Sequence, residues 1–160
     1  MELVEGELRI TLPASAIGRK FDDASHRFKN VMKAVDFIVE EPDRILFIEC
    51  KDPDQAGATA ERLDAFRKEL MSDVLDLALK YKYRDSWLHE WAAQRVNKPI
   101  TYLVLLGLSS LSSADLLRRS EVLKKALPSQ LGGAFVHACL VLNLEAWNRH
   151  FPHMCVSRLP

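Results

Sequence analysis

The chain has 160 residues, of which 48% are hydrophobic and 28% charged, as in a single soluble globular domain rather than a disordered or fibrous protein. Its 22 basic and 22 acidic residues do not give the basic excess that is usual in proteins that bind nucleic acid mainly by neutralising phosphates. No apolar run reaches the roughly 20 residues of a membrane helix and the start lacks a secretory pattern, so we expect a cytoplasmic protein without membrane contact.

The first third of the chain predicts strands and one long loop. Residues 2–12 alternate loosely and are predicted as one strand, and residues 14–33 as a polar loop. Residues 33–40 and 44–51 are two β-rich runs. The segment Glu41-Pro42-Asp43 between them predicts a hairpin turn, because proline presets φ and aspartate bonds its own backbone.

Helical periodicity dominates the middle of the chain. Apolar residues spaced three and four apart predict helix over residues 58–94, in two pieces if Ser72 caps a second one. Residues 100–108 are apolar on both faces, which is typical of a strand in the middle of a sheet that is covered on either side.

The last third predicts a second helix and a final buried strand. Ser112 and Asp115 form a loose capping box before a helix that Pro128 ends. A Gly132-Gly133 turn leads to a strand over residues 134–144. The tail is expected to pack over the core through Trp147, Phe151 and Pro152. We find no linker, so residues 1–160 are predicted to form one domain.

The hairpin places two acidic residues side by side. A loop centred on Pro42-Asp43 pairs positions whose numbers add to 85, so Asp36 lies opposite Glu49 with Cβ atoms roughly 4.5 to 5.5 Å apart. Lys51, two positions after Glu49, points to the same face of the sheet. Cys50 points to the opposite face, so its sulfur belongs to the core.

Two neighbouring carboxylates repel each other unless a cation lies between them. Mg²⁺ is the expected ion, with Mn²⁺ as the alternative, because both accept carboxylate oxygens and retain positions for a phosphate. The predicted metal ligands are Asp36, Glu49 and the backbone carbonyl of Cys50, and Lys51 would orient the nucleophile or stabilise negative charge during phosphodiester hydrolysis.

The segments Val35-Asp36-Phe37 and Ile48-Glu49-Cys50-Lys51 resemble the motif of the PD-(D/E)XK nuclease superfamily, which includes restriction endonucleases and Holliday-junction resolvases. The resemblance implies an α/β fold, a restriction endonuclease-like mixed β-sheet core flanked by helices. It also implies that Asp36, Glu49 and Lys51 are the catalytic residues. The chain is similar as well to small bacterial proteins with a Lys-Tyr-Arg-Asp-Ser segment, found here at residues 82–86.

The chain departs from the family motif at two points. Val35 stands where the motif has proline. Many members also carry an acid on an upstream helix, and here that acid is Glu5, Glu7, Asp22 or Asp23. The motif itself spans only residues 36–51, whereas the predicted order of elements covers residues 33–142.

A nuclease must also contact its substrate, which we expect to be DNA. Lys80, Lys82 and Arg84 alternate with two tyrosines and are candidates for nucleic-acid binding, although snorkelling cations on an ordinary helix give the same pattern. A homodimer or a partner protein would supply the basic surface that the balanced charge lacks. The alternative function is a catalytically silent nuclease-fold subunit that serves protein-protein interaction in a bacterial complex.

Overall fold

The structure is a computed structural model and describes residues 1–23, 31–128 and 136–160. This part of the chain forms two β-sheets and four helices. The five-stranded sheet has the order β3 (Ile17–Lys20), β4 (Phe37–Glu40), β5 (Ile45–Lys51), β6 (Ile100–Leu106) and β7 (Val136–Asn143). The three-stranded sheet has the order β1 (Glu2–Glu5), β2 (Leu8–Thr11) and β8 (Cys155–Arg158). The helices are α1 (Ala60–Leu70), α2 (Asp73–Ala92), α3 (Ser113–Ala126) and α4 (Leu144–His150).

The five-stranded sheet is mixed. Strands β3, β4 and β5 run antiparallel to one another, whereas β5, β6 and β7 are parallel. Parallel neighbours require a crossover, and the helical pair α1–α2 and then α3 supply the two crossovers. The prediction of an α/β fold with a mixed sheet and flanking helices is therefore confirmed.

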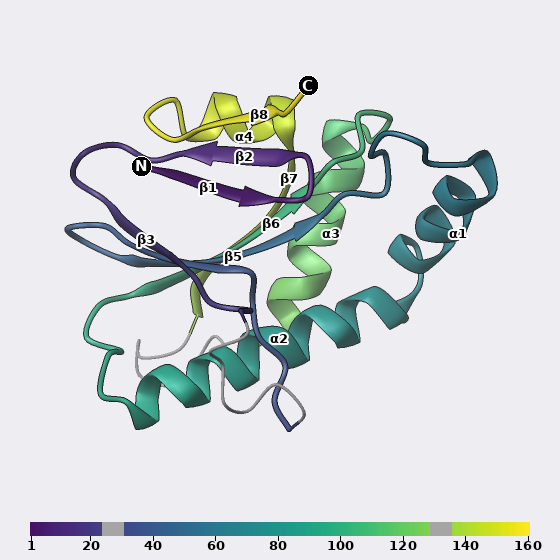
Figure 1. The fold of residues 1–160 in the computed structure, drawn as a ribbon. Helices are drawn as coiled ribbons and strands as arrows, with labels where there is room; N and C mark the ends of the chain where they lie inside the picture. The colour runs from purple at the N-terminus through teal and green to yellow at the C-terminus, as the bar shows by residue number, and fades with distance from the viewer. Residues whose placement is uncertain (24–30, 129–135) are drawn as a thin grey trace.

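The large sheet is the middle of three layers (Figure 1). Helices α2 and α3 cover one face, and the three-stranded sheet with α4 covers the other. Strand β5 shows how side chains divide between the layers, because Phe47 packs toward the helices while Ile48 and Cys50 pack toward the small sheet. Alternation therefore turns Glu49 and Lys51 toward the helices.

Most of the predicted elements are confirmed. The hairpin of β4 and β5 has its turn where the proline predicted it, although β4 begins at Phe37 and residues 33–36 of the predicted run are not in a strand. The helical stretch is divided in two, and the Ser72 side chain accepts a hydrogen bond from the Val74 amide at the start of α2. Ser112 and Asp115 form the predicted capping box. Strand β6 is buried along its whole length and lies between β5 and β7, so it is an interior strand, as predicted.

Three predictions of secondary structure were wrong. Residues 2–12 form a hairpin rather than one strand, because Gly6 takes a φ of 56° and lets the chain turn between β1 and β2. The loop over residues 14–33 contains β3, the edge strand that pairs with β4. The strand β7 is not the last, because β8 pairs with β2.

The tail is anchored as predicted by two of its three residues. Trp147 and Phe151 are buried in the core beneath the small sheet, and the Trp147 indole donates a hydrogen bond of 2.7 Å to the Met154 carbonyl. Pro152 is exposed. The predicted Gly132-Gly133 turn lies outside the described residues. Within the described ranges, no helix has the length and apolar character needed to cross a membrane.

Candidate active site

The hairpin register is the one that the turn predicts. Phe37 pairs with Ile48 and Ile38 with Phe47, so the paired numbers add to 85 along the whole ladder. Asp36, one residue before β4, therefore lies beside Glu49 on the helix-facing side of the sheet. Lys51 ends β5 on the same side.

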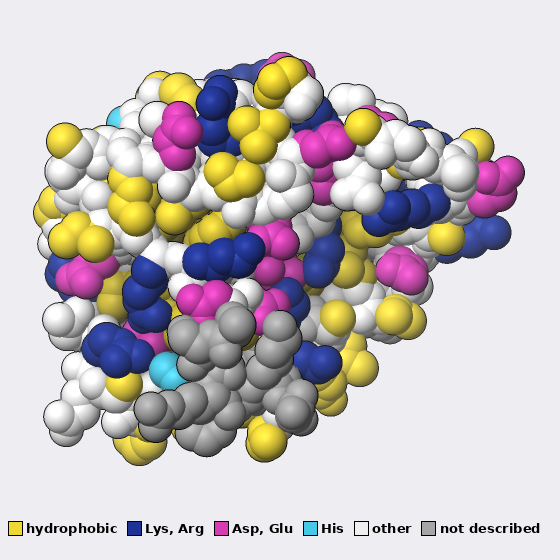
Figure 2. Space-filling model, in the orientation of Figure 1, with side chains coloured by type: hydrophobic (Ala, Val, Ile, Leu, Met, Phe, Trp, Pro, Cys, Tyr) yellow, Lys and Arg dark blue, Asp and Glu magenta, His cyan; other side chains and the backbone are white. Residues whose placement is uncertain are grey.

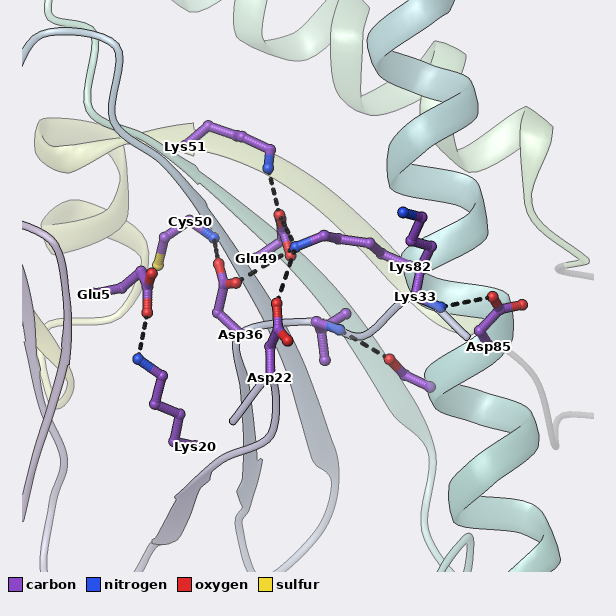
Figure 3. Close-up of polar contacts among 12 residues, drawn as sticks. Glu5, Lys20, Asp22, Lys33, Asp36, Glu49, Cys50, Lys51, Lys82 and Asp85 are labelled. Carbon is purple, nitrogen blue, oxygen red and sulfur yellow. Dashed lines mark hydrogen bonds and ion pairs between the residues drawn. The ribbon is translucent and has the colours of Figure 1, made fainter. Parts of the chain in front are cut away.

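Backbone contacts fix the position of Asp36. Its Oδ2 accepts a hydrogen bond of 2.6 Å from the Cys50 amide, across the two strands. The segment before β4 is held against α2, because the Val35 amide donates to Ser86 Oγ at 3.0 Å and the Lys33 amide donates to Asp85 Oδ2 at 2.9 Å. One oxygen of Asp36, Oδ1, is thereby left facing α2 (Figure 3).

Glu49 is the most buried acid of the site, with 0% of its surface exposed. Its Oε1 forms two ion pairs, at 2.7 Å from the Lys51 ammonium and 2.7 Å from the Lys82 ammonium. Its Oε2 is buried and has no hydrogen-bond partner among the described residues. A carboxylate oxygen in this state is costly unless a proton or a cation binds it.

Lys82 reaches from α2 into the centre of the acidic side chains (Figure 3). Besides its contact with Glu49, its Nζ lies 3.5 Å from Asp36 Oδ1 and 4.0 Å from Asp22 Oδ2. An ammonium group thus lies between the carboxylates, at the place where the sequence predicted a divalent ion. We call Asp22, Asp36, Glu49, Lys51 and Lys82 the carboxylate–lysine cluster.

Burial sets the protonation of the cluster. It raises the pKa of Glu49 to about 7, with a further increase from Asp36, and Lys51 and Lys82 only partly oppose this. The pKa of Asp36 is raised mainly by burial as well, against the Lys82 charge and the Cys50 amide. Burial alone would lower the pKa of Lys82, but Glu49 and Asp36 raise it above its ordinary value. Lys82 is therefore charged at neutral pH, where Glu49 lies near its midpoint.

Of the four upstream acids, Asp22 lies in the cluster, because its Oδ2 is 4.0 Å from the Lys82 ammonium. It follows β3 on a bend rather than a helix. Glu5 instead pairs with Lys20 at 2.9 Å, and Glu7 contacts Arg158 at 3.2 Å.

The other predicted residues lie as follows. The Cys50 sulfur is buried on the opposite face of the sheet, as predicted, while its amide rather than its carbonyl is the group that contacts Asp36. Lys80, Lys82 and Arg84 do not form one surface, because residues two apart on a helix point in different directions. Arg84 lies over the Tyr81 ring at 4.7 Å and pairs with Asp85, and Lys80 is half-buried.

Lys82 is the cluster residue whose role the sequence did not indicate. One signal existed, since it stands three residues after Leu79 and seven after Leu75, both of which are buried. A lysine on the buried side of a helix requires an acidic partner, but the identity of that partner depends on how α2 packs against β5.

Lys51 connects the buried carboxylates to the surface. Its side chain is 31% exposed and lines an open hollow of about 280 Å³, together with Arg62 and Phe66 of α1. Figure 2 shows basic and acidic side chains lying next to one another across the middle of this face. An anionic ligand in the hollow would meet Lys51 before it met either buried acid.

The donor atoms suit a hard divalent ion. Asp36 Oδ1 and Glu49 Oε2 are carboxylate oxygens without a hydrogen bond from the backbone, and Mg²⁺ is bound in proteins by one or two such groups. The described residues contain no group of three or more histidine, cysteine or acidic side chains close enough to hold an ion together. The site therefore fits an ion only if Lys82, which has a long flexible stem, moves out from between the two acids.

The comparisons with known proteins identify no relative, since no family model, curated protein or solved structure matches the chain. Membership of the PD-(D/E)XK superfamily consequently stays a prediction. Its basis is the motif in the sequence and the geometry of the carboxylate–lysine cluster.

Proposed function

We propose that this protein is a nuclease that requires a divalent metal ion, Mg²⁺ or Mn²⁺, and hydrolyses phosphodiester bonds in DNA. The observation that carries the proposal is the register of the hairpin. It brings Asp36 and Glu49 together on one face with Lys51 beside them, each from the position that the motif requires.

The roles of the residues follow from their positions. Asp36 and Glu49 would hold the ion, which when bound would withdraw charge from the scissile phosphate and lower the pKa of a water molecule. Lys51, at the edge of the hollow, would contact the phosphate and stabilise its developing negative charge. Lys82 would keep the two acids close together in the metal-free protein and pair with them less closely once an ion is present.

DNA remains the expected substrate although the net charge is zero. Arg62 lines the hollow as a second cation beside Lys51, and the acids Asp52 and Glu69 line it too. Lys80, which is half-buried on α2, stays a candidate for a phosphate contact. So few cations predict weak binding with a shallow salt dependence.

One observation favours the alternative, a catalytically silent subunit in a protein complex. The ammonium groups of Lys51 and Lys82 already pair with the buried acids, so the acids have cationic partners without any metal ion. A cluster of this kind can be purely structural. In that case the protein would neither bind Mn²⁺ at the carboxylates nor cleave DNA.

Cleavage of supercoiled plasmid and of branched DNA tests the proposal. We expect the wild-type protein to cleave with Mg²⁺ or Mn²⁺ and not with EDTA, and both Glu49→Gln and Lys51→Ala to reduce the rate by at least about 100-fold. Lys98→Ala is the matched control, because Lys98 pairs with Glu40 at the other end of the sheet. Equal cleavage by all four proteins would reveal a contaminating nuclease, and cleavage by none would favour the silent subunit.

A further inference from the structure

Helix α2 is apolar on two opposite sides. Leu75, Leu79 and Tyr83 face the large sheet and are buried. The opposite side carries five apolar side chains that are between 38% and 64% exposed, namely Val74, Leu77, Tyr81, Leu88 and Trp91. We call this second side the outer stripe. Because Leu75, Leu79 and Tyr83 face the large sheet, the outer stripe lies on the side of α2 that is turned away from that sheet.

The outer stripe has the spacing of a helix-pairing seam. Its members follow one another at intervals of three, four, seven and three residues, and Arg84 fills the one missing position, so the pattern is a heptad repeat with two apolar positions. Such a repeat keeps one line of side chains on one side of a helix and suits a second helix laid along it.

The outer stripe is complementary to the outer stripe of a second, antiparallel copy of α2. In an antiparallel pair related by a twofold axis between residues 82 and 83, positions that add to 165 meet. The small Val74 then faces the large Trp91 of the second copy, Leu77 faces Leu88, and Tyr81 faces Arg84. Within one chain the Arg84 guanidinium already lies 4.7 Å above the Tyr81 ring, so this contact is favourable for the same two side chains.

The size of the stripe suits a weak dimer. Residues 74–91 span about 26 Å of helix, and two such stripes packed together would bury on the order of 1,000 Å², the lower limit for a specific interface. Five exposed apolar side chains in one line on a 160-residue protein otherwise need a partner to cover them. A twofold contact also closes on itself and does not continue into a fibre.

We propose that the outer stripe of α2 is a homodimer interface, in which a second copy of the same helix packs antiparallel at the register that joins Leu77 to Leu88. The proposal does not depend on the nuclease activity. The carboxylate–lysine cluster lies on the other side of α2, so a dimer of this form leaves both clusters uncovered.

Sedimentation velocity over a range of protein concentrations tests the interface. We expect wild-type dimers with a dissociation constant on the order of micromolar, and a loss of affinity of about 100-fold or more in Leu77→Glu. Leu117→Glu is the matched control, because Leu117 is an even more exposed leucine, on α3. A wild-type protein that stays monomeric at all concentrations would overturn the proposal, as would a dimer that Leu117→Glu dissociates and Leu77→Glu does not.

Mixing two variants tests the register. Leu77→Lys and Leu88→Glu should each be monomeric, yet an equimolar mixture should form heterodimers, because the antiparallel register places the new lysine opposite the new glutamate. A parallel helix pair would place residue 77 opposite residue 77 and would not be rescued. Failure of the mixture to associate would therefore overturn the proposed arrangement even if the single variants dissociate, and circular dichroism of each variant establishes that it is folded.

Discussion

Replacing Lys82 by methionine is expected to lower the free energy of unfolding by about 3 kcal/mol at pH 8 in EDTA, because two buried carboxylates then share only Lys51. The cost should shrink at pH 5, where Glu49 takes up a proton and no longer needs a cation. Urea denaturation at the two pH values measures both quantities.

Lys98→Met is the control for the loss of a lysine. Lys98 pairs with the exposed Glu40 at 2.8 Å, so its removal should cost no more than about 1 kcal/mol and should depend little on pH in this range. If Lys82→Met and Lys98→Met have the same stability, Lys82 does not hold the buried acids together. The ion pairs of the carboxylate–lysine cluster would then contribute nothing to folding.

The stability of the metal-free protein is expected to fall as the pH rises from about 4.5 to about 7, by about 3 kcal/mol from Glu49 alone. The pKa of Glu49 is higher in the folded protein than in the unfolded chain. Below pH 4.5 the carboxyl is protonated in both states, and its contribution is fully present. Between the two pKa values only the unfolded chain releases the proton, so the free energy of unfolding decreases with pH until Glu49 is ionised in both states.

Glu49→Gln should remove most of this pH dependence and should be more stable than the wild type at pH 8. Glu90→Gln is the opposite control. Although burial raises the pKa of Glu90, its contacts with Arg95 and Arg19 lower it to about 2, so Glu90 stabilises the protein at every pH above its ordinary value of 4.5. Its replacement should therefore destabilise the protein at pH 8. Equal pH profiles for the wild type and Glu49→Gln would contradict the assignment of a raised pKa to Glu49.

The hairpin could be predicted because its determinants are local. Proline and aspartate in the turn fix the pairing of β4 with β5, and that pairing places Asp36 beside Glu49 without further information. The starts of the helices could be predicted for the same reason. The Ser72 and Ser112 side chains accept hydrogen bonds from amides two and three residues later, at the starts of α2 and α3.

The remaining errors concern contacts between distant segments. Strand β3 has no apolar alternation, because it is an edge strand whose Ile17 is exposed and whose Gly18 leaves room for Leu3 and Leu12. Strand β8 exists only because β2 offers it an edge. Lys82 joins the cluster because α2 packs against β5, and this long-range packing cannot be predicted from the residues around position 82.

The alternation of Lys80, Lys82 and Arg84 shows how a pattern can mislead. On a strand these three cations would form one basic row, as a nucleic-acid surface requires. On α2 they diverge, so that Lys82 enters the core side while Arg84 lies on the outer stripe with Tyr81. Positively charged residues that alternate along a helix therefore do not by themselves indicate a binding surface.

Titration with Mn²⁺, followed by the loss of the electron paramagnetic resonance signal of the free ion, tests most directly whether the buried acids form a metal site. At pH 8 we predict saturable binding of Mn²⁺ that Asp36→Asn and Glu49→Gln each abolish, that Lys98→Met leaves unchanged, and that Lys82→Met strengthens because the competing ammonium is gone. Mn²⁺ binding that is absent, or that is the same in all five proteins, would contradict the account.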